Sequence, residues 1–324
     1  MSWFTTGAVG EFLAEAGDFL RTDPARNTVL LSVTENLRVS TAARPPASPA
    51  SPGTPGTPES PESPGSPGSP TPPAGDETLL GWWRPGPAGS PNAVGGAFLH
   101  TPGFPVVLTA MPGDAVTGLA GELAASGRRI PGLSAETQAA QVFADAWRQR
   151  TGDVANPYRR IRLYRLGTLV RPNPGPEGKP RVADERDRDL LVGWSVAFLR
   201  NIGDGAERAA AEVDGRLGYG GLTVWEAGGT PVSMAGITRI VQAMARVGAV
   251  YTPPELRGRG YAGGVTAAVS QAALDAGAAE VVLFTDLANP TSNALYERLG
   301  YRPVEDRTEL SFAPAAESPA PGER

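Results

Sequence analysis

The chain has 324 residues and a formal net charge of −5, and it contains no cysteine and a single histidine, His100. Disulfides, thiolate zinc sites and cysteine nucleophiles are therefore excluded, and one histidine cannot build a multi-histidine metal site. No run of Lys or Arg stands out, so the charge gives no support for a nucleic-acid surface. We expect neither a metal nor a nucleic-acid partner.

The length predicts two domains, at about 100–200 residues each. No stretch approaches the ~20 apolar residues of a membrane span. Acidic residues interrupt the N-terminal segment, which lacks the features of a signal peptide. We therefore expect a cytoplasmic protein that does not associate with membranes. His100 has no Gly-x-Ser-x-Gly motif near it, which favours a structural role over a place in a Ser-His-Asp triad.

Residues 41–76 consist almost entirely of Pro, Ser, Thr, Gly, Ala and Glu, so they cannot join a hydrophobic core. A proline falls at every third position from Pro49 to Pro70, but Glu59 and Glu62 stand where collagen would need glycine. A solvated polyproline-like segment is therefore predicted. Only forty residues precede it, too few for an independent core. We expect a disordered insertion within a first α/β domain, residues 1–155.

Apolar periodicity predicts the elements of this first domain. The expected helices are Val9–Leu20, Val116–Ser126 and Ser134–Arg150, the last beginning near Ser134, and the expected strands are Asn27–Val33, Thr78–Trp83, Val94–Leu99 and Val106–Ala110.

The apolar pattern of residues 156–313 predicts a second α/β unit with a mixed sheet, and residues 314–324 are expected to form a disordered tail. The expected strands are Arg160–Val170, Leu222–Glu226, Pro231–Thr238, Val247–Thr252, Val281–Phe284, Tyr301–Val304 and Thr308–Phe312. The expected helices are Asp184–Arg200, Gly205–Leu217, Val265–Ala276 and Asn289–Leu299, and Pro172–Pro180 is expected to be a loop.

The segment Val250–Ala262 is the one that carries chemistry. A strand runs into a loop with two glycines, Gly258 and Gly260, and the loop runs into a helix. Glycines allow a sharp turn and close approach to a ligand, and the helix start presents free N–H groups and the positive end of its dipole. This arrangement suits a phosphate or pyrophosphate. Arg257 and Arg259 add positive charge beside it.

Two nucleotide-binding interpretations compete for this segment. Gly258-x-Gly260-x-x-Gly263, with Asp286 further on, matches the dinucleotide-binding pattern and would indicate an NAD-dependent oxidoreductase. However, Pro253–Arg257 separates the strand from the glycines, and repeated strand–helix units do not follow, as a doubly wound sheet would need.

The second interpretation fits better. Arg257-x-x-Gly260-x-Ala262 resembles the acetyl-CoA loop of the GNAT acetyltransferase superfamily, Gln/Arg-x-x-Gly-x-Gly/Ala. Asn289–Tyr301 resembles the family's second cofactor segment, Asn-x-x-Ala-x-x-Leu-Tyr-x-x-x-Gly-Phe/Tyr, and the two segments follow in the family's order. The resemblance implies a GNAT-type acyl-CoA fold in the C-terminal half. It also implies an N-acetyltransferase that moves the acetyl group of acetyl-CoA to a primary amine by direct attack in a ternary complex.

The resemblance implies roles for individual residues. Tyr296 would be the general acid that protonates the leaving thiolate of CoA. Backbone groups of Val250 and Thr252 would hold the pantetheine arm and the acetyl carbonyl. The other expected cofactor contacts are the pyrophosphate cradle of Gly258, Arg259, Gly260, Tyr261 and Ala262, the charge of Arg257 and Arg259, and the amides of Asn289 and Asn293. Asn289 is also placed to cap a helix.

The amine must lose a proton, yet the strand Val247–Thr252 has no carboxylate where many relatives carry a Glu. Glu226, at the end of a neighbouring strand, is the proposed base, with Asp286 and Glu255 as weaker candidates. Trp194 and Phe198 either border the acceptor site or pack in the core. The acceptor is expected to be a small-molecule or peptide amine.

The pattern of residues 1–155 is consistent with a second, degenerate GNAT-like unit. It contains no Arg-x-x-Gly-x-Gly/Ala loop after a strand, so such a unit would have lost the cofactor and could shape the acceptor pocket. An acyl-CoA-binding pseudoenzyme or regulator is the alternative to an active enzyme.

Overall fold

The computed structural model describes residues 2–43, 77–86 and 93–314. The predicted disorder of the Pro-rich insertion and of the tail therefore lies almost wholly outside the described residues. Among the described residues, no helix combines the length and apolar character needed to cross a bilayer.

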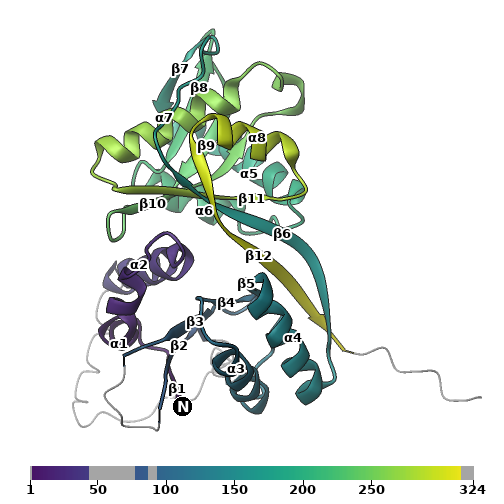
Figure 1. Ribbon diagram of the computed structural model, residues 1–324. Helices are drawn as coiled ribbons and strands as arrows, with labels where there is room; N and C mark the ends of the chain where they lie inside the picture. The colour runs from purple at the N-terminus through teal and green to yellow at the C-terminus, as the bar shows by residue number, and fades with distance from the viewer. Residues whose placement is uncertain (1, 44–76, 87–92, 315–324) are drawn as a thin grey trace, which may run out of the picture.

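Within its described residues, the N-terminal half forms six strands and four helices, arranged as Figure 1 shows. The strands are β1 (Ser2–Thr6), β2 (Leu79–Arg84), β3 (Gly96–His100), β4 (Val106–Leu108), β5 (Gly132–Glu136) and β6 (Val154–Leu166). The helices are α1 (Val9–Arg21), α2 (Thr28–Ala43), α3 (Gly113–Ala125) and α4 (Thr137–Thr151).

The C-terminal half repeats that number of strands and helices and adds two short 3-10 turns. Its strands are β7 (Lys179–Val182), β8 (Leu222–Ala227), β9 (Thr230–Ile237), β10 (Met244–Tyr251), β11 (Glu280–Asp286) and β12 (Tyr301–Ala313). Its helices are α5 (Arg188–Asn201), α6 (Ala209–Leu217), α7 (Tyr261–Asp275) and α8 (Pro290–Arg298), with turns at η1 (Glu185–Asp187) and η2 (Pro254–Leu256).

All the described strands join one mixed sheet of 12 strands, in the order β1-β2-β3-β4-β5-β12-β6-β11-β10-β9-β8-β7. Both halves follow the element order β-α-α-β-β-β-α-β-α-β, and in each the fourth and fifth strands pair in parallel. The last strand of each half pairs with the other half: β6 with β11, and β12 with β5. Strands β6 and β12 also pair with each other along the junction (Figure 1). The halves therefore exchange their final strands.

The helices cover both faces of this sheet. One core cluster lies between α7, α8 and the C-terminal strands, a second lies under α5 and α6, and a third joins α3 and α4 to the N-terminal strands. The fourth cluster crosses the junction, because Leu30 and Leu31 of α2 share it with Leu163, Met244 and Val282 of the central strands. Helix α2 therefore packs against strands of both halves, and α1 packs on β1 and β2.

Three sequence-based expectations were wrong. Asn27–Val33 is not a strand but the start of α2. The first two turns of this helix are largely buried against strands of both halves, so the apolar run there is too continuous to show a helical period. Its buried hydroxyls bond the preceding turn, as in Ser32 Oγ to Thr28 O at 2.6 Å and Thr34 Oγ1 to Leu30 O at 2.7 Å. A buried helix and a buried strand look alike in such short runs.

The helix expected to begin near Ser134 begins at Thr137, because the preceding residues form β5. The Glu136 side chain caps α4, accepting from the N–H groups of Gln138 and Ala139 at 3.0 and 3.2 Å. The two strands expected after Gly300 are a single strand, β12, with a register shift between Pro303 and Glu305. The edge strands β1 and β7 were not expected at all.

Strand β10 departs from regular geometry at its C-terminal end. Its parallel pairing with β11 runs from Met244–Glu280 to Val247–Leu283 and goes no further. Beyond that point, the register against β9 shifts between Gly248 and Tyr251, and Ala249 adopts φ = 49°, in the left-handed region. A bulge of this kind bends the strand. β10 and β11 therefore part where β10 leads into the glycine loop.

The contact between β5 and β12 can be tested at Gly132, where an added Cβ would lie 2.1 Å from the carbonyl oxygen of Leu310. Because that neighbour is backbone, Gly132→Ala should lower the free energy of unfolding by about 1–3 kcal/mol or more. Gly10→Ala on α1, with no atom within 4 Å of the new Cβ, should be neutral or stabilising. Chemical denaturation would measure both, and equal effects would contradict the exchange of β12.

The bulge can be tested by glycine substitution on one strand. Ala249→Gly should maintain or raise the free energy of unfolding, by up to about 1 kcal/mol, because relief of the left-handed strain offsets the freedom that glycine adds to the unfolded chain. Ala245→Gly, at a fully buried position two pairs before the bulge, should lower it by about 1 kcal/mol or more. Similar losses in urea denaturation would rule out the strained conformation.

Candidate functional site

The loop between β10 and α7 leads into a helix N-terminus whose positive dipole end is not neutralised by an acidic residue in the first turn. Gly258 and Gly260 have φ angles of 77° and 81°, in the left-handed region that glycine tolerates. Gly260 is the N-cap of α7, where no side chain caps the helix and the first turn contains no acidic residue. The first N–H groups of a helix have no intrahelical acceptor. They and the helix dipole therefore favour an anion here.

The two arginines of the loop have different surroundings. Arg257 Nε donates to the carbonyl oxygen of Thr252 at 3.0 Å and so closes the loop onto the end of β10. Arg259 is exposed, with Nη2 3.5 Å from the carbonyl oxygen of Glu255. Arg257 therefore holds the shape of the loop, whereas Arg259 places its charge in solvent beside the helix start.

A proline-rich turn before β7 packs on the first turns of α7. An added Cβ on Gly264 would lie 2.8 Å from Pro176 Cγ and 3.0 Å from the Trp225 ring. Gly263 faces Leu295 of α8 and Pro172 of the same turn. These glycines allow close packing between neighbouring segments.

The dinucleotide-binding interpretation does not fit the sheet. Among the described strands, only β4–β5 and β10–β11 pair in parallel, whereas a doubly wound sheet is mostly parallel. The 3-10 turn η2 also separates β10 from the glycines.

The predicted asparagines hold the turn between β11 and α8. Asn289 is the N-cap of α8, its Oδ1 accepting from Ser292 N–H at 3.0 Å. Asn293 Nδ2 donates to the carbonyl oxygens of Asp286 and Asn289 at 2.8 and 2.7 Å. The structure thus supports the capping role of Asn289, and contacts of either amide with a cofactor stay a prediction.

Sequence reasoning missed Tyr164, which contacts α8 from β6. It is fully buried on β6, and its hydroxyl lies 3.1 Å from Asn293 Oδ1 and 3.0 Å from Glu297 Oε1. No local motif could reveal it, because the strand reaches α8 only through the exchange between the two halves.

Tyr296 is buried on the inner face of α8, its ring 6.0 Å from that of Tyr301 in an edge-on arrangement. Burial raises the pKa of the Tyr296 phenol to about 12. Tyr301 bonds Ser270 at 2.7 Å, but among the described residues the Tyr296 hydroxyl has no such partner. Tyr296 therefore carries its proton at neutral pH, and its role as the proton donor stays a prediction.

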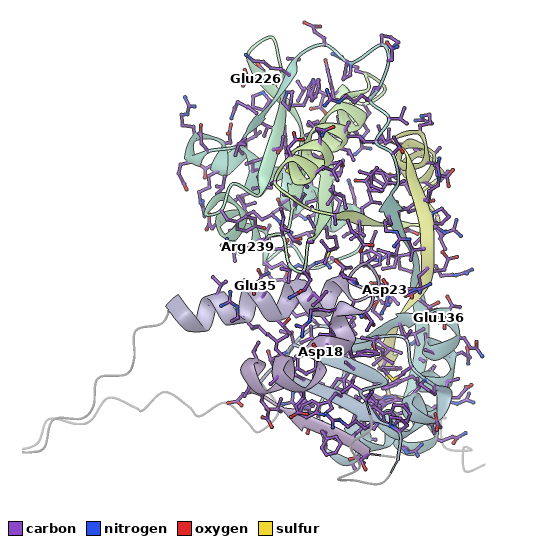
Figure 2. All side chains as sticks on the ribbon, turned by 60° about the vertical axis from the view of Figure 1, so that its left-hand side comes forward. Asp18, Asp23, Glu35, Glu136, Glu226 and Arg239 are labelled. Carbon is purple, nitrogen blue, oxygen red and sulfur yellow. The ribbon has the colours of Figure 1, made fainter. Side chains whose placement is uncertain are left out.

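The candidate bases lie in different surroundings. Glu226 Oε2 accepts from Arg181 Nε at 2.6 Å, and Arg181 also bonds both carboxylate oxygens of Asp187. Glu226 lies at the far end of the C-terminal half from Arg239 (Figure 2). Asp286 ends β11 and accepts from Ala288 N–H at 2.8 Å, while Glu255 is exposed on η2. No interaction distinguishes one of them as the base, so the role of Glu226 stays a prediction.

The end of β10 is lined by buried side chains. Thr252 Oγ1 lies 2.8 Å from Ser233 Oγ, which donates to the carbonyl oxygen of Tyr251 at 2.9 Å. The Trp194 and Tyr251 rings are 6.2 Å apart, and Trp194 and Phe198 both pack on the cluster under α5. Their packing role is thus visible in the structure.

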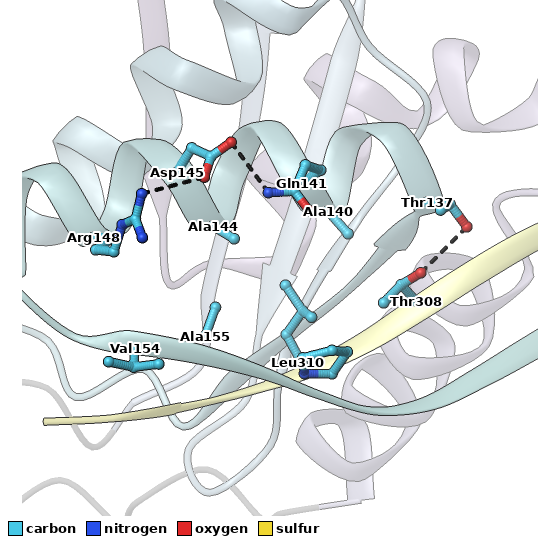
Figure 3. A pocket seen from close by; sticks show the side chains of 11 residues that line it. Thr137, Ala140, Gln141, Ala144, Asp145, Arg148, Val154, Ala155, Thr308 and Leu310 are labelled. Carbon is cyan, nitrogen blue, oxygen red and sulfur yellow. Dashed lines mark hydrogen bonds and ion pairs between the residues drawn. The ribbon is translucent and has the colours of Figure 1, made fainter. Parts of the chain in front are cut away.

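Other hollows lie away from the glycine loop. One of about 220 Å³ lies between α4 and the paired strands β6 and β12, where Thr308 Oγ1 bonds Thr137 Oγ1 at 3.2 Å (Figure 3). Another, of about 670 Å³, lies at the junction beside Glu136, Arg160 and Arg162. In the described part of the chain, acidic side chains and His100 do not gather in groups of three or more that could hold a metal ion.

Comparisons with known proteins agree with this geometry. No curated protein matches the sequence. The acetyltransferase (GNAT) family model matches residues 181–301, from β7 to the start of β12.

Solved structures share the fold. A GNAT-family acetyltransferase from Colwellia psychrerythraea is 12% identical, with 72% of this chain and 85% of that chain covered and a TM-score of 0.50. A GCN5-related N-acetyltransferase from Sphaerobacter thermophilus is 16% identical, with 73% and 80% covered and a TM-score of 0.51. A Drosophila protein is 14% identical, with 74% and 80% covered and a TM-score of 0.55. These solved structures share the fold, and the family match shows that residues 181–301, in the C-terminal half of the chain, form a GNAT acetyltransferase domain.

Proposed function

We propose that the protein is an N-acetyltransferase that transfers the acetyl group of acetyl-CoA to a primary amine. The observation that carries the proposal is the N-terminus of α7, which has no side-chain cap and no acidic residue in its first turn. This N-terminus adjoins the place where β10 and β11 part. A pyrophosphate fits the first feature, because both its charge and its oxygen atoms match the free N–H groups. An extended pantetheine arm fits the second, because backbone groups beyond Val247 are not paired with β11.

The reaction needs one proton donor and one proton acceptor. The amine nitrogen attacks the acetyl carbonyl carbon, the carbon–sulfur bond breaks, and the thiolate of CoA takes up a proton while the new amide loses one. Tyr296 is the proposed donor to the thiolate, since burial keeps its hydroxyl protonated. The amine proton is proposed to leave through water, with Glu226 as its final acceptor.

The N-terminal half is proposed to be a GNAT-like unit without a cofactor. Its connection from β4 to α3 is short, and Asp114 places a carboxylate in the first turn of α3, which would repel a phosphate. Arg307 of β12 also fills the space where β4 and β5 part, donating to the carbonyl oxygens of Leu108 and Ser134 at 2.8 Å each. At the equivalent register, β11 faces Ile161.

An acyl-CoA-binding pseudoenzyme is the alternative function. The same glycine loop would support it, but a buried, protonated Tyr296 is a feature that binding alone does not require. Turnover with amines therefore separates the two.

Titration calorimetry would test the donor site. Wild-type protein should bind acetyl-CoA and not NAD, whereas Gly260→Trp, with a bulky side chain at the N-cap of α7, should lose the binding. Gly103→Trp is a matched control, because Gly103 has a similar φ of 79° and open space around it, in the N-terminal half. In a thermal-shift assay, acetyl-CoA at a hundredfold excess over Kd should raise the apparent free energy of unfolding of the wild type by about 2.7 kcal/mol. A folded wild type that does not bind would contradict the proposal.

The proton donor is tested by Tyr296→Phe. Because this change removes only the hydroxyl, kcat should fall by about 10²–10⁴-fold while acetyl-CoA affinity stays. The donor must be protonated and its pKa is raised to about 12, so its ionisation should cause no loss of wild-type rate up to a pH of about 10. Tyr301→Phe on the neighbouring ring is the control. Equal kcat in the wild type and Tyr296→Phe would dismiss Tyr296 as the acid.

A further inference from the structure

A side-chain-free surface lies beside the place where β10 and β11 part. Gly248 of β10 pairs directly with Gly236 of β9, so two neighbouring strands both lack side chains at this level. An added Cβ on Gly248 would meet no atom within 4 Å, and one on Gly236 would lie 3.3 Å from Cδ and Nε of Arg216. This Gly236–Gly248 surface is therefore open on one side and bordered by an arginine on the other.

Two more arginines surround the same surface. Arg246 precedes it on β10 and shares its face of the sheet, since the intervening Val247 packs on the opposite face with α7. Arg239 lies with its guanidinium 4.2 Å above the Tyr219 ring. The Tyr219 hydroxyl donates to the carbonyl oxygen of Ile237 at 2.8 Å, which holds that ring beside the strand.

These cations have few acidic partners within the described chain. Arg246 forms no ion pair there, and its nearest side-chain acceptor is Thr28 Oγ1 of α2, at 3.5 Å. The pKa of Arg246 is lowered to about 10 by burial and by the charge of Arg216. Half-buried charges are normally paired, so an arginine without a carboxylate at this depth points to a partner supplied from outside.

Two carboxylates near the cluster in the described chain, Glu212 and Glu35, are already engaged. Glu212 bonds Arg216 at 3.1 Å and Arg208 at 2.8 Å, so it is shared. Glu35 of α2 lies toward Arg239 (Figure 2) but is bound by both arms of Arg38, at 2.9 and 2.8 Å. In a chain whose overall charge is −5, this surface thus carries a local excess of positive charge.

We propose that the Gly236–Gly248 surface binds the acceptor, and that the acceptor is an amino carboxylate whose anion is held by Arg216 and Arg246. This inference rests on the proposed transferase function. Arg246 and Gly248 are two residues apart, which is about 7 Å along a strand. The long Arg246 side chain can span part of this distance. A carboxylate held by Arg246 and an amine that reaches the acetyl group where β10 and β11 part can therefore be only a few bonds apart, as they are in an α-amino acid.

The test uses the full chain, acetyl-CoA and matched acceptor pairs: glycine with glycinamide, and L-alanine with L-alaninamide. CoA release gives kcat/KM for each. The wild type should prefer the carboxylates over the amides by about tenfold to a hundredfold, as expected for charge-assisted hydrogen bonds. Arg246→Met and Arg216→Met should each reduce this preference, chiefly through KM for the carboxylates. Arg165→Met, at an exposed arginine on β6 that pairs with Glu280, should retain it.

The outcomes separate this inference from the proposed function. A wild type that favours the amides, or a preference unchanged in both Arg246→Met and Arg216→Met, would overturn the assignment of the acceptor. Acetyl-CoA binding with turnover of neutral amines alone would overturn it too, while the donor site would stand. Failure to bind acetyl-CoA at all would overturn both. If Arg246→Met does not fold, the half-buried Arg216 gives the same comparison.

Discussion

The exchange of the last strands is the constraint on which the rest of the structure depends. Strand β6 completes the sheet beside β11, and β12 completes it beside β5, so each half supplies hydrogen bonds that the other needs. A strand edge without a partner exposes unpaired N–H and C=O groups. The exchange also brings α2 against β10, next to the surface we assign to the acceptor, and Tyr164 against α8. The catalytic half is therefore shaped by residues from the first half of the chain.

The two halves differ at the same place in a shared plan. In the C-terminal half, β10 bends away from β11 and opens onto a glycine loop and an uncapped helix. In the N-terminal half, Arg307 bridges the corresponding strands, and the helix that follows has Asp114 in its first turn. The equivalent N-termini of α7 and α3 thus differ in charge, because only α3 has an acidic residue in its first turn. An anion is favoured at the N-terminus of α7 and disfavoured at that of α3, which is the physical reason why we place the proposed donor site in the C-terminal half.

Sequence patterns located the donor loop because its chemistry is local: Gly258 and Gly260 both adopt the left-handed conformations that their residue type suggests. Most of the helices were also predictable from periodicity, whereas β12 was expected as two strands. The start of α2 was not, because its first two turns are largely buried and show no polar face. The acceptor surface could not be predicted either. Arg216, Arg246 and Gly236 come from three elements, and only the register of β9 against β10 places them together.

The position of β12 has a consequence for the order in which the protein can fold. The N-terminal half contains all of its helices by residue 151, yet the strand that pairs with β5 spans residues 301–313. During synthesis at the ribosome, this half must therefore wait with an open sheet edge until nearly the whole remaining chain has emerged. Long-range pairing of this kind is slow to form. Until then, the unpaired edge of β5 is exposed to aggregation and is a site where a chaperone could bind.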